Sequence, residues 1–384
     1  MAAIASLQSL TLDLPPSCVE FDPFHPELFV VGTYHLEPSK NVDEANDKVE
    51  EGSSQTRRGS ISLFRLNRNE ISVLQTVPTP SAILDLHFSP HKAERGFMMA
   101  VTSTGSLMTF KVSSGSGTTP RLDHIQSYQL YSPNVLILSF AFHPQYSGLI
   151  GMSLSTGQIC LCDRFCDASQ EMRPEASDWN QPMEITAHDL EAWTIAFSPS
   201  GDVFSGGDDS ALKLCRIAQG SPPPADRLVE TSASSKYTYQ ASWTDHKIHS
   251  AGVTTILPLG DDMVVTGSYD EYLRLLKVPA YGRREVLAEA CLGGGVWRLR
   301  LAETCMQMCS PDEYVLLASC MHAGARIVKL ARSSSRGWTV EVLATFEEHR
   351  SMNYGSDTQA STESSGRVIS CSFYDKLLCL WQYM

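Results

Sequence analysis

The most constraining feature of this sequence is the stretch from residue 188 to residue 217, HDLEAWTIAFSPSGDVFSGGDDSALKLCRI. Three short runs of strand-forming residues are separated by two tight polar turns, SPSGD and GGDD. A histidine opens the stretch, and Asp209 stands in its last turn. This arrangement is typical of one blade of a WD-type β-propeller. Because a single blade cannot bury its own faces, the chain must supply further copies.

The same unit recurs along the whole chain. Clear copies are GSYDEYLRLLKV and SFYDKLLCLWQY, and four weaker copies fill the intervals around them. The residue six places after the turn aspartate, or after its equivalent, serves as the anchor of each copy. The seven anchors are Phe64, Phe110, Cys162, Cys215, Leu276, Val328 and Trp381. They lie 46 to 61 residues apart, slightly more than the roughly 40–45 residues of a bare WD repeat. We therefore predict an all-β, seven-bladed WD40-type β-propeller.

The two ends of the sequence predict how the ring closes. The last copy stops after its third strand, at Met384, and the stretch from Ile4 to Leu14 alternates weakly between apolar and polar residues. Pairing this N-terminal stretch with the last blade would remove an exposed sheet edge. We expect one propeller domain over residues 1–384. Polar insertions are expected near residues 36–59, 167–186, 218–245 and 358–366.

Composition excludes several classes of function. The net charge of −13 argues against a nucleic-acid backbone as the main partner, because phosphate binding needs a basic surface. It is compatible with a basic protein or a cationic substrate group. No run approaches the roughly eighteen apolar residues of a membrane span, and the N-terminus lacks the features of a secretory signal. We expect a monomeric, cytoplasmic protein.

Cysteine usage points to reduced thiols. The eleven cysteines are odd in number and follow no regular framework, which favours the cytosol. Cys160 and Cys162 do not have the spacing of zinc ligands, so we interpret them as residues packed on a strand face. We expect no metal site and no cofactor.

The turn aspartates have a structural explanation. In WD blades this aspartate accepts hydrogen bonds that hold the turn, often from the histidine of the same blade. The expected pairs are Asp209 with His188, Asp270 with His246 or His249, and Asp375 with His349.

The residues beside these turns are candidates for function. The turn between the second and third strands and the loop entering the first strand lie on the same face of a blade, so their side chains should meet over the central channel. These residues are Asp208, Tyr269, Met321 and Tyr374 before the turns, His322 in place of an aspartate, and Trp193, Trp297, Arg298 and Tyr354 near the starts of first strands. Each alone is more often a packing residue. Together, their aromatic and charged groups suit a small-molecule or side-chain site.

Familiar catalytic motifs are missing. The sequence contains no G-x-S-x-G, no G-x-x-x-x-G-K-[ST] and no H-E-x-x-H. Motifs alone therefore favour a binding platform.

Five stretches add a family resemblance. WTIAF with SGGDDS, TGSYDEYLRL, GGGVWRLR, ASCMHAGARIV and SMNYGSD occur in this order. Together they resemble the WD-repeat diphthine methyl ester esterase family, also called diphthine methyltransferase. The resemblance is close in the C-terminal half, whereas the N-terminal half matches only as repeats. One position departs from the family pattern: Thr358 stands where a tryptophan usually follows the aspartate of the last stretch, here Asp357.

This resemblance implies a carboxylic ester hydrolase. Its substrate would be the methyl-esterified diphthine side chain on elongation factor 2, and hydrolysis would release methanol and allow final amidation to diphthamide. The substrate also carries a trimethylammonium group, which aromatic faces near carboxylates hold well. The residues that could form such a cage are Trp193, Tyr269, Trp297 and Tyr354, with Glu191 and Asp208.

Ester hydrolysis also needs a base and donors for the developing oxyanion. We predict His322 as the base, oriented by Asp208 or Asp270. Arg298 or the amides of Gly293–Gly295 are the predicted oxyanion donors. Cys320 is a weaker candidate nucleophile, because its strand position predicts burial. The competing interpretation is a non-catalytic propeller that recruits proteins into a complex, as most WD propellers do.

Overall fold

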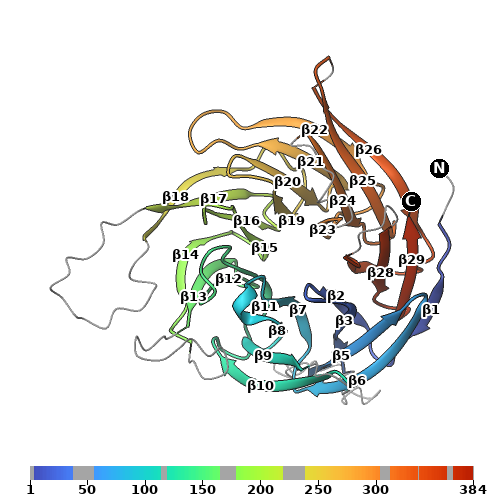
Figure 1. Ribbon diagram of the computed structural model, residues 1–384. Helices are drawn as coiled ribbons and strands as arrows, with labels where there is room; N and C mark the ends of the chain where they lie inside the picture. The colour runs from blue at the N-terminus through green and yellow to red at the C-terminus, as the bar shows by residue number, and fades with distance from the viewer. Residues whose placement is uncertain are drawn as a thin grey trace, which may run out of the picture.

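The chain forms a closed ring of seven antiparallel sheets around a central channel (Figure 1). A computed structural model describes residues 4–37, 56–113, 119–164, 179–218, 238–302, 312–335, 337–360 and 366–383. The first strands of neighbouring blades contact one another all the way round the ring. The predicted seven-bladed propeller is therefore confirmed.

Each blade runs from the channel outward. Blade 1 contains β2 (Pro16–Asp22), β3 (His25–Thr33), β5 (Arg57–Asn67) and β6 (Glu70–Thr79), with the short β4 (His35–Leu36) also paired to β5. Blade 2 contains β7 (Ile83–Phe88), β8 (Phe97–Thr102), β9 (Ser106–Ser113) and β10 (Arg121–Gln129), with the 3₁₀ turn η1 (Lys92–Glu94) between β7 and β8. Blade 3 contains β11 (Ile137–Phe142), β12 (Leu149–Leu154), β13 (Gln158–Asp163) and β14 (Met183–Ala187).

The remaining blades follow the same order. Blade 4 contains β15 (Ala192–Phe197), β16 (Val203–Gly207), β17 (Leu212–Ala218) and β18 (Thr238–Asp245). Blade 5 contains β19 (Val253–Pro258), β20 (Met263–Ser268), β21 (Tyr272–Lys277) and β22 (Glu285–Cys291). Blade 6 contains β23 (Arg298–Leu301), β24 (Glu313–Ser319), β25 (Ala325–Ser333) and β26 (Gly337–Phe346). Blade 7 contains β27 (Asn353–Thr358), β28 (Gly366–Ser372), β29 (Leu377–Tyr383) and β1 (Gln8–Thr11).

The ring closes as the ends of the sequence predict. Strand β1 pairs antiparallel with β29, so that Gln8 lies opposite Leu380 and Thr11 opposite Leu377. The N-terminal strand thus supplies the outer strand that blade 7 lacks, and Figure 1 shows the two ends of the chain close together. Each of the seven anchors lies in the third strand of its blade.

A left-handed turn residue marks the repeat. In five blades, the residue five places before the anchor has a positive φ. These residues are Gly105 (φ 68°), Gly157 (φ 87°), Ser210 (φ 60°), Glu271 (φ 70°) and Lys376 (φ 56°). Glycine adopts this conformation without a steric penalty, whereas for a residue with a Cβ it costs roughly 1–2 kcal/mol of conformational free energy. The turn geometry is therefore kept even where the local sequence disfavours it.

The core lies between the blades. Each interface between neighbouring blades has its own cluster of buried apolar residues. Between blades 6 and 7, Trp381 is fully buried and stacks on Phe346, with 5.1 Å between ring centroids. Cys160 and Cys162 are buried between blades 2 and 3, which confirms their interpretation as packing residues.

The turn aspartates only partly follow the expected pairing. His188 Nδ1–H donates to Asp209 Oδ1 (2.9 Å), and the Ser205 hydroxyl lies 2.9 Å from His188 Nε2. In blade 5 the histidine is His249, and Thr266, not Asp270, is its partner. In blade 7, His349 likewise contacts Ser370. The expected pairs of Asp270 and Asp375 with a histidine are therefore wrong.

Other side chains satisfy these two carboxylates. Asp270 accepts two hydrogen bonds from Arg274 Nη1, at 2.8 and 2.9 Å, and a longer one from the Ser250 hydroxyl, at 3.4 Å. Asp375 accepts from the Ser372 hydroxyl and from the backbone N–H of Arg350. Both carboxylates still hold their turns, but with partners other than those of a standard WD blade.

Most of the expected insertions lie outside the described residues. Two of the expected insertions end in regular strands. Strand β14 begins within the stretch 167–186, and β18 occupies the end of the stretch 218–245. No helix in the described segments has the length and apolarity needed to cross a bilayer.

Candidate functional site

Four aromatic side chains from four different blades meet at the mouth of the channel. Trp193 is the second residue of β15, Tyr269 follows β20, Trp297 precedes β23 and Tyr354 is the second residue of β27. The ring of Trp297 lies 5.5 Å from that of Trp193, 6.0 Å from Tyr269 and 5.0 Å from Tyr354. All four rings are half-buried. We call these four residues the aromatic cluster, and Trp297 is its central member.

The line of rings continues into blades 7 and 1. Phe373 lies 5.6 Å from Tyr354, 5.8 Å from Tyr34 and 5.0 Å from the exposed Tyr374. Sequence reasoning missed Phe373 and Tyr34. Tyr34 directly follows the second strand of its blade, as Tyr269 does, so comparing this position across blades could have found it.

Two carboxylates lie beside the aromatic cluster. The Trp193 Nε1–H donates to Asp208 Oδ1 (3.0 Å), and the backbone N–H of Asp208 donates to the carbonyl of Glu191 (2.8 Å). Burial raises the pKa of the Tyr269 hydroxyl, and the neighbouring Tyr354, Asp208 and Glu191 raise it further. Tyr269 therefore keeps its proton at neutral pH. The structure thus brings together all six residues proposed for the cage.

Arg298 is not part of this group. Its Nη2 makes an ion pair with Asp85 Oδ1 of blade 2 (2.7 Å), across the channel from its own strand in blade 6. The side chain of Asp85 is only 1% exposed. Arg298 is therefore held by a buried carboxylate, and the predicted role as an oxyanion donor is not supported by its contacts.

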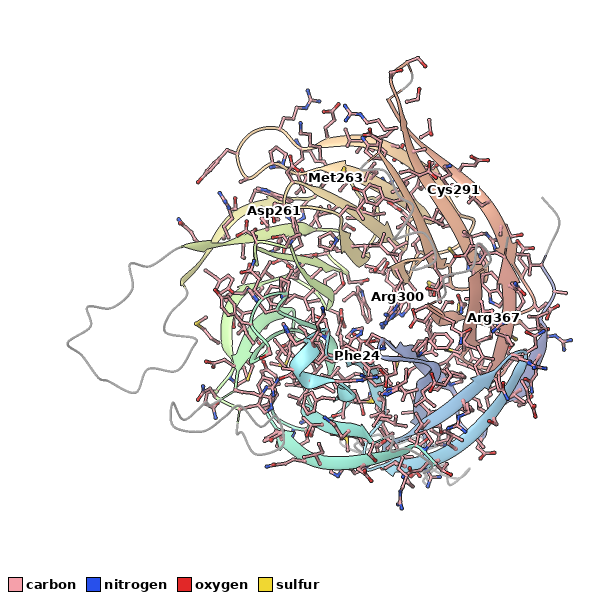
Figure 2. The ribbon with its side chains drawn as sticks, in the orientation of Figure 1. Phe24, Asp261, Met263, Cys291, Arg300 and Arg367 are labelled. Carbon is pink, nitrogen blue, oxygen red and sulfur yellow. The ribbon has the colours of Figure 1, made fainter. Side chains whose placement is uncertain are left out.

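The Arg298–Asp85 pair belongs to a six-membered ion network in the channel. Its members are Glu20, Asp85, Asp357, His87, Arg298 and Arg300. His87 joins two of its carboxylates, with Nδ1 2.7 Å from Glu20 and Nε2 3.2 Å from Asp85. Arg300 pairs with Glu20 and lies 3.7 Å from Asp357. Figure 2 shows Arg300 near the centre of the ring. Blades 1, 2, 6 and 7 are thus connected across the channel.

Charge pairing sets the ionisation of this channel network. Burial alone would raise the pKa of Glu20, but Arg300 and His87 outweigh it and lower the pKa to about 2. Burial would lower the pKa of His87, yet Asp85 and Glu20 raise it to about 9. His87 is therefore a cation at neutral pH. By contrast, burial raises the pKa of Asp357 although the neighbouring Arg300 lowers it, so Asp357 holds its proton more strongly than a free aspartic acid does.

The raised pKa of His87 predicts a pH-dependent stability. The stabilisation from its protonation is complete below the ordinary pKa of 6.5 and is lost as pH rises through about 9. A His87→Gln variant lacks this titration. The difference in unfolding free energy between the wild type and this variant should therefore shrink between pH 6.5 and pH 9, as measured by urea denaturation. A difference that stays constant over this range would contradict the assignment.

His322 lies on the rim outside the aromatic cluster. Its side chain is exposed, and it makes no hydrogen bond or ion pair with the described part of the chain. The expected orienting partners are engaged elsewhere, Asp208 with Trp193 and Asp270 with Arg274. The preceding residue, Met321, packs against the loop before Trp297 instead. Its sulfur lies so close to Gly295 that a Cβ added at Gly295 would be 2.6 Å from it.

The loop before Trp297 offers backbone donors. Gly294 and Gly295 are buried, and within the described residues their N–H groups donate no hydrogen bond. A side chain at Gly294 would collide with the carbonyl oxygen of Cys320. Cys320 itself is fully buried, and burial raises the pKa of its thiol to about 12. A thiol in this state is a poor nucleophile, as its strand position predicts.

Comparison with known proteins identifies the relatives of the chain. A protein named diphthine methyltransferase from Schizosaccharomyces pombe is 28% identical over 96% of this chain and 95% of its own length. A diphthine methyltransferase homolog from Dictyostelium discoideum is 26% identical over 96% of this chain and 97% of its own length. The protein named diphthine methyltransferase from Homo sapiens is 27% identical over 93% of this chain and 75% of its own length. The chain is a homologue of these diphthine methyltransferases.

The homology extends over the whole propeller, including the N-terminal half. The family model "WD domain, G-beta repeat" matches residues 179–215, which is blade 4 with the residues entering it. Solved propellers are similar at the level of fold. The Myceliophteria thermophila Swd1 β-propeller domain aligns over 99% of this chain and all of its own, with a TM-score of 0.63 and 11% identity. The WD40 domain of Doa1 has a TM-score of 0.60 and 12% identity, covering 99% and 97%.

A separate groove of about 600 Å³ lies between β1 and the outer strands β5 and β6 of blade 1. Leu10, Leu12 and Phe64 give it an apolar lining. It shares no residue with the aromatic cluster and contains none of the candidate catalytic groups. In this diphthine methyltransferase homologue, the candidate catalytic groups therefore lie outside this groove.

Proposed function

We propose that the chain hydrolyses the methyl ester of the methylated diphthine side chain on elongation factor 2. The reaction releases methanol and leaves a carboxylate for final amidation to diphthamide. One observation carries this proposal: the channel mouth joins four aromatic rings from four blades to two carboxylates. The relatives named diphthine methyltransferase support a place in the same modification pathway.

The aromatic cluster suits the fixed cation of this substrate. A trimethylammonium group has no N–H to donate, so it is best held by the negative faces of aromatic rings. Trp297 and Trp193 supply the largest aromatic faces, and the ring of the protonated Tyr269 contacts both of them. Asp208 and Glu191 add negative charge next to the rings. This combination favours a quaternary ammonium over a neutral group of equal size.

The bond changes of ester hydrolysis can be assigned to groups at the mouth. His322 takes a proton from water as the oxygen of that water bonds to the ester carbonyl carbon. The N–H groups of Gly294 and Gly295 stabilise the oxyanion that forms. The carbon–oxygen bond to the methoxy group then breaks, and the proton returns from His322 to release methanol.

The decisive assay uses methyl-esterified elongation factor 2. On incubation with the purified chain, its mass should fall by one methylene unit, and methanol should appear in equal amount. A scaffold protein would bind the factor and leave its mass unchanged. An unchanged mass would therefore remove the esterase proposal and favour the scaffold.

His322→Ala tests the proposed base. We expect kcat to fall by roughly 100- to 10,000-fold, the usual range for a positioned acid–base group. The variant should remain folded and should bind the cationic substrate as the wild type does, because His322 is outside the aromatic cluster. If turnover is retained in His322→Ala but lost in Asp208→Asn, the base is Asp208 instead.

A further inference from the structure

The carboxylates at the channel mouth are not neutralised. Glu191 is exposed, and Asp208 accepts its side-chain hydrogen bond from the neutral Trp193 indole. Within the described chain, neither carboxylate has an ion pair. By contrast, Asp270 makes an ion pair with Arg274, and Asp209 accepts a hydrogen bond from His188.

The two arginines that follow Trp297 in sequence do not compensate for this charge. Arg298 and Arg300, which closely follow Trp297, are both paired within the channel ion network. Each of their guanidinium groups already contacts a carboxyl group of that network, Asp85 for Arg298, and Glu20 and Asp357 for Arg300. Negative charge at the mouth therefore acts directly on whatever the rings hold.

We propose that Glu191 and Asp208 make the mouth select a cationic ester against the zwitterionic acid formed by its hydrolysis. The inference rests on the proposed function, which supplies the ester and its product. Both molecules carry the same quaternary ammonium. Hydrolysis replaces the neutral ester group with a carboxylate close to that cation, and two fixed carboxylates repel it. The reaction itself thus weakens binding, and the product leaves.

Small ligands test this selectivity without relying on turnover. The probes are trimethylglycine methyl ester, which is cationic, and trimethylglycine, which is the corresponding zwitterion. Their dissociation constants can be measured by calorimetry or by quenching of tryptophan fluorescence. We expect the wild type to bind the ester about tenfold more tightly than the acid, a factor that corresponds to about 1.4 kcal/mol.

Neutral isosteres at the two positions should remove the preference. Asn at position 208 can still accept the hydrogen bond from Trp193, so Asp208→Asn combined with Glu191→Gln changes charge rather than shape. In this double variant, the ester-to-acid ratio should fall to within about threefold of unity. Asp262→Asn, an exposed charge removed from the β19–β20 turn on the opposite face, should keep the wild-type ratio.

The outcomes separate this inference from the function on which it rests. Equal binding of the two probes by the wild type, or an unchanged ratio in the double variant, overturns it. Failure of both probes to bind overturns it as well. If selectivity is found but esterified elongation factor 2 is not hydrolysed, the proposed esterase function is wrong while the charge selectivity of the mouth stands.

Discussion

Trp297→Ala is expected to reduce ester hydrolysis at least about 30-fold in kcat/KM while the propeller stays folded, since a desolvated cation–π contact is worth about 2 kcal/mol or more. Trp297 contacts each of the other three rings of the aromatic cluster, so its loss also frees Trp193 and Tyr354 to move. The ring is half-buried at the mouth and is not part of an inter-blade core. Removing it should therefore have a larger effect on the reaction than on folding.

The test compares substrate turnover with thermal stability. Tyr281→Ala serves as the control, because Tyr281 is 85% exposed and follows the third strand of blade 5, away from the mouth. Trp297→Phe should retain part of the activity, since it keeps an aromatic face. Full activity in Trp297→Ala would show that the rings do not hold the substrate.

The second large effect concerns stability. Asp85→Asn should lower the free energy of unfolding by about 3–5 kcal/mol, the usual cost of leaving buried charges without a partner. Asp85 accepts from Arg298, His87 and the Ser139 hydroxyl, so the substitution leaves Arg298 without its carboxylate and His87 with Glu20 alone. Urea denaturation measures this loss directly.

Two further variants identify the origin of this loss. Asp13→Asn removes an exposed carboxylate and should change stability by less than about 0.5 kcal/mol. Combining Asp85→Asn with Arg298→Met should recover part of the loss, because the unpaired guanidinium is removed as well. A loss in Asp85→Asn no larger than that of Asp13→Asn would mean that the channel network does not stabilise the ring.

The fold could be predicted from sequence because it depends on local, repeated signals. The spacing between turn and anchor reports a hairpin geometry that five blades share down to the left-handed residue, such as Gly157 or Lys376. The aromatic cluster could be predicted for the same reason. Tyr269 stands beside such a turn and Trp297 directly before a first strand, and a closed ring necessarily brings these positions to one face.

The remaining features depend on contacts that no local pattern encodes. Arg298 and Asp85 are 213 residues apart in sequence, and their pairing depends on how long side chains cross the channel. Asp270 takes Arg274 rather than a histidine as its partner. The repeat pattern does not show which of two nearby side chains makes this contact. His322 is exposed, and the residue before it, Met321, has a left-handed backbone with a φ of 44°. The repeat pattern does not predict this conformation.

The most direct test of the central claim is to let the wild-type chain act on methyl-esterified elongation factor 2 in water labelled with heavy oxygen. Hydrolysis at the carbonyl carbon predicts one labelled oxygen in each new carboxylate, and the same product formed at least about 30-fold more slowly with Trp297→Ala. A demethylated product without label would mean that the bond between the methyl carbon and the ester oxygen had broken, as in methyl transfer, rather than the bond to the carbonyl carbon. That result would contradict the mechanism derived from the channel mouth.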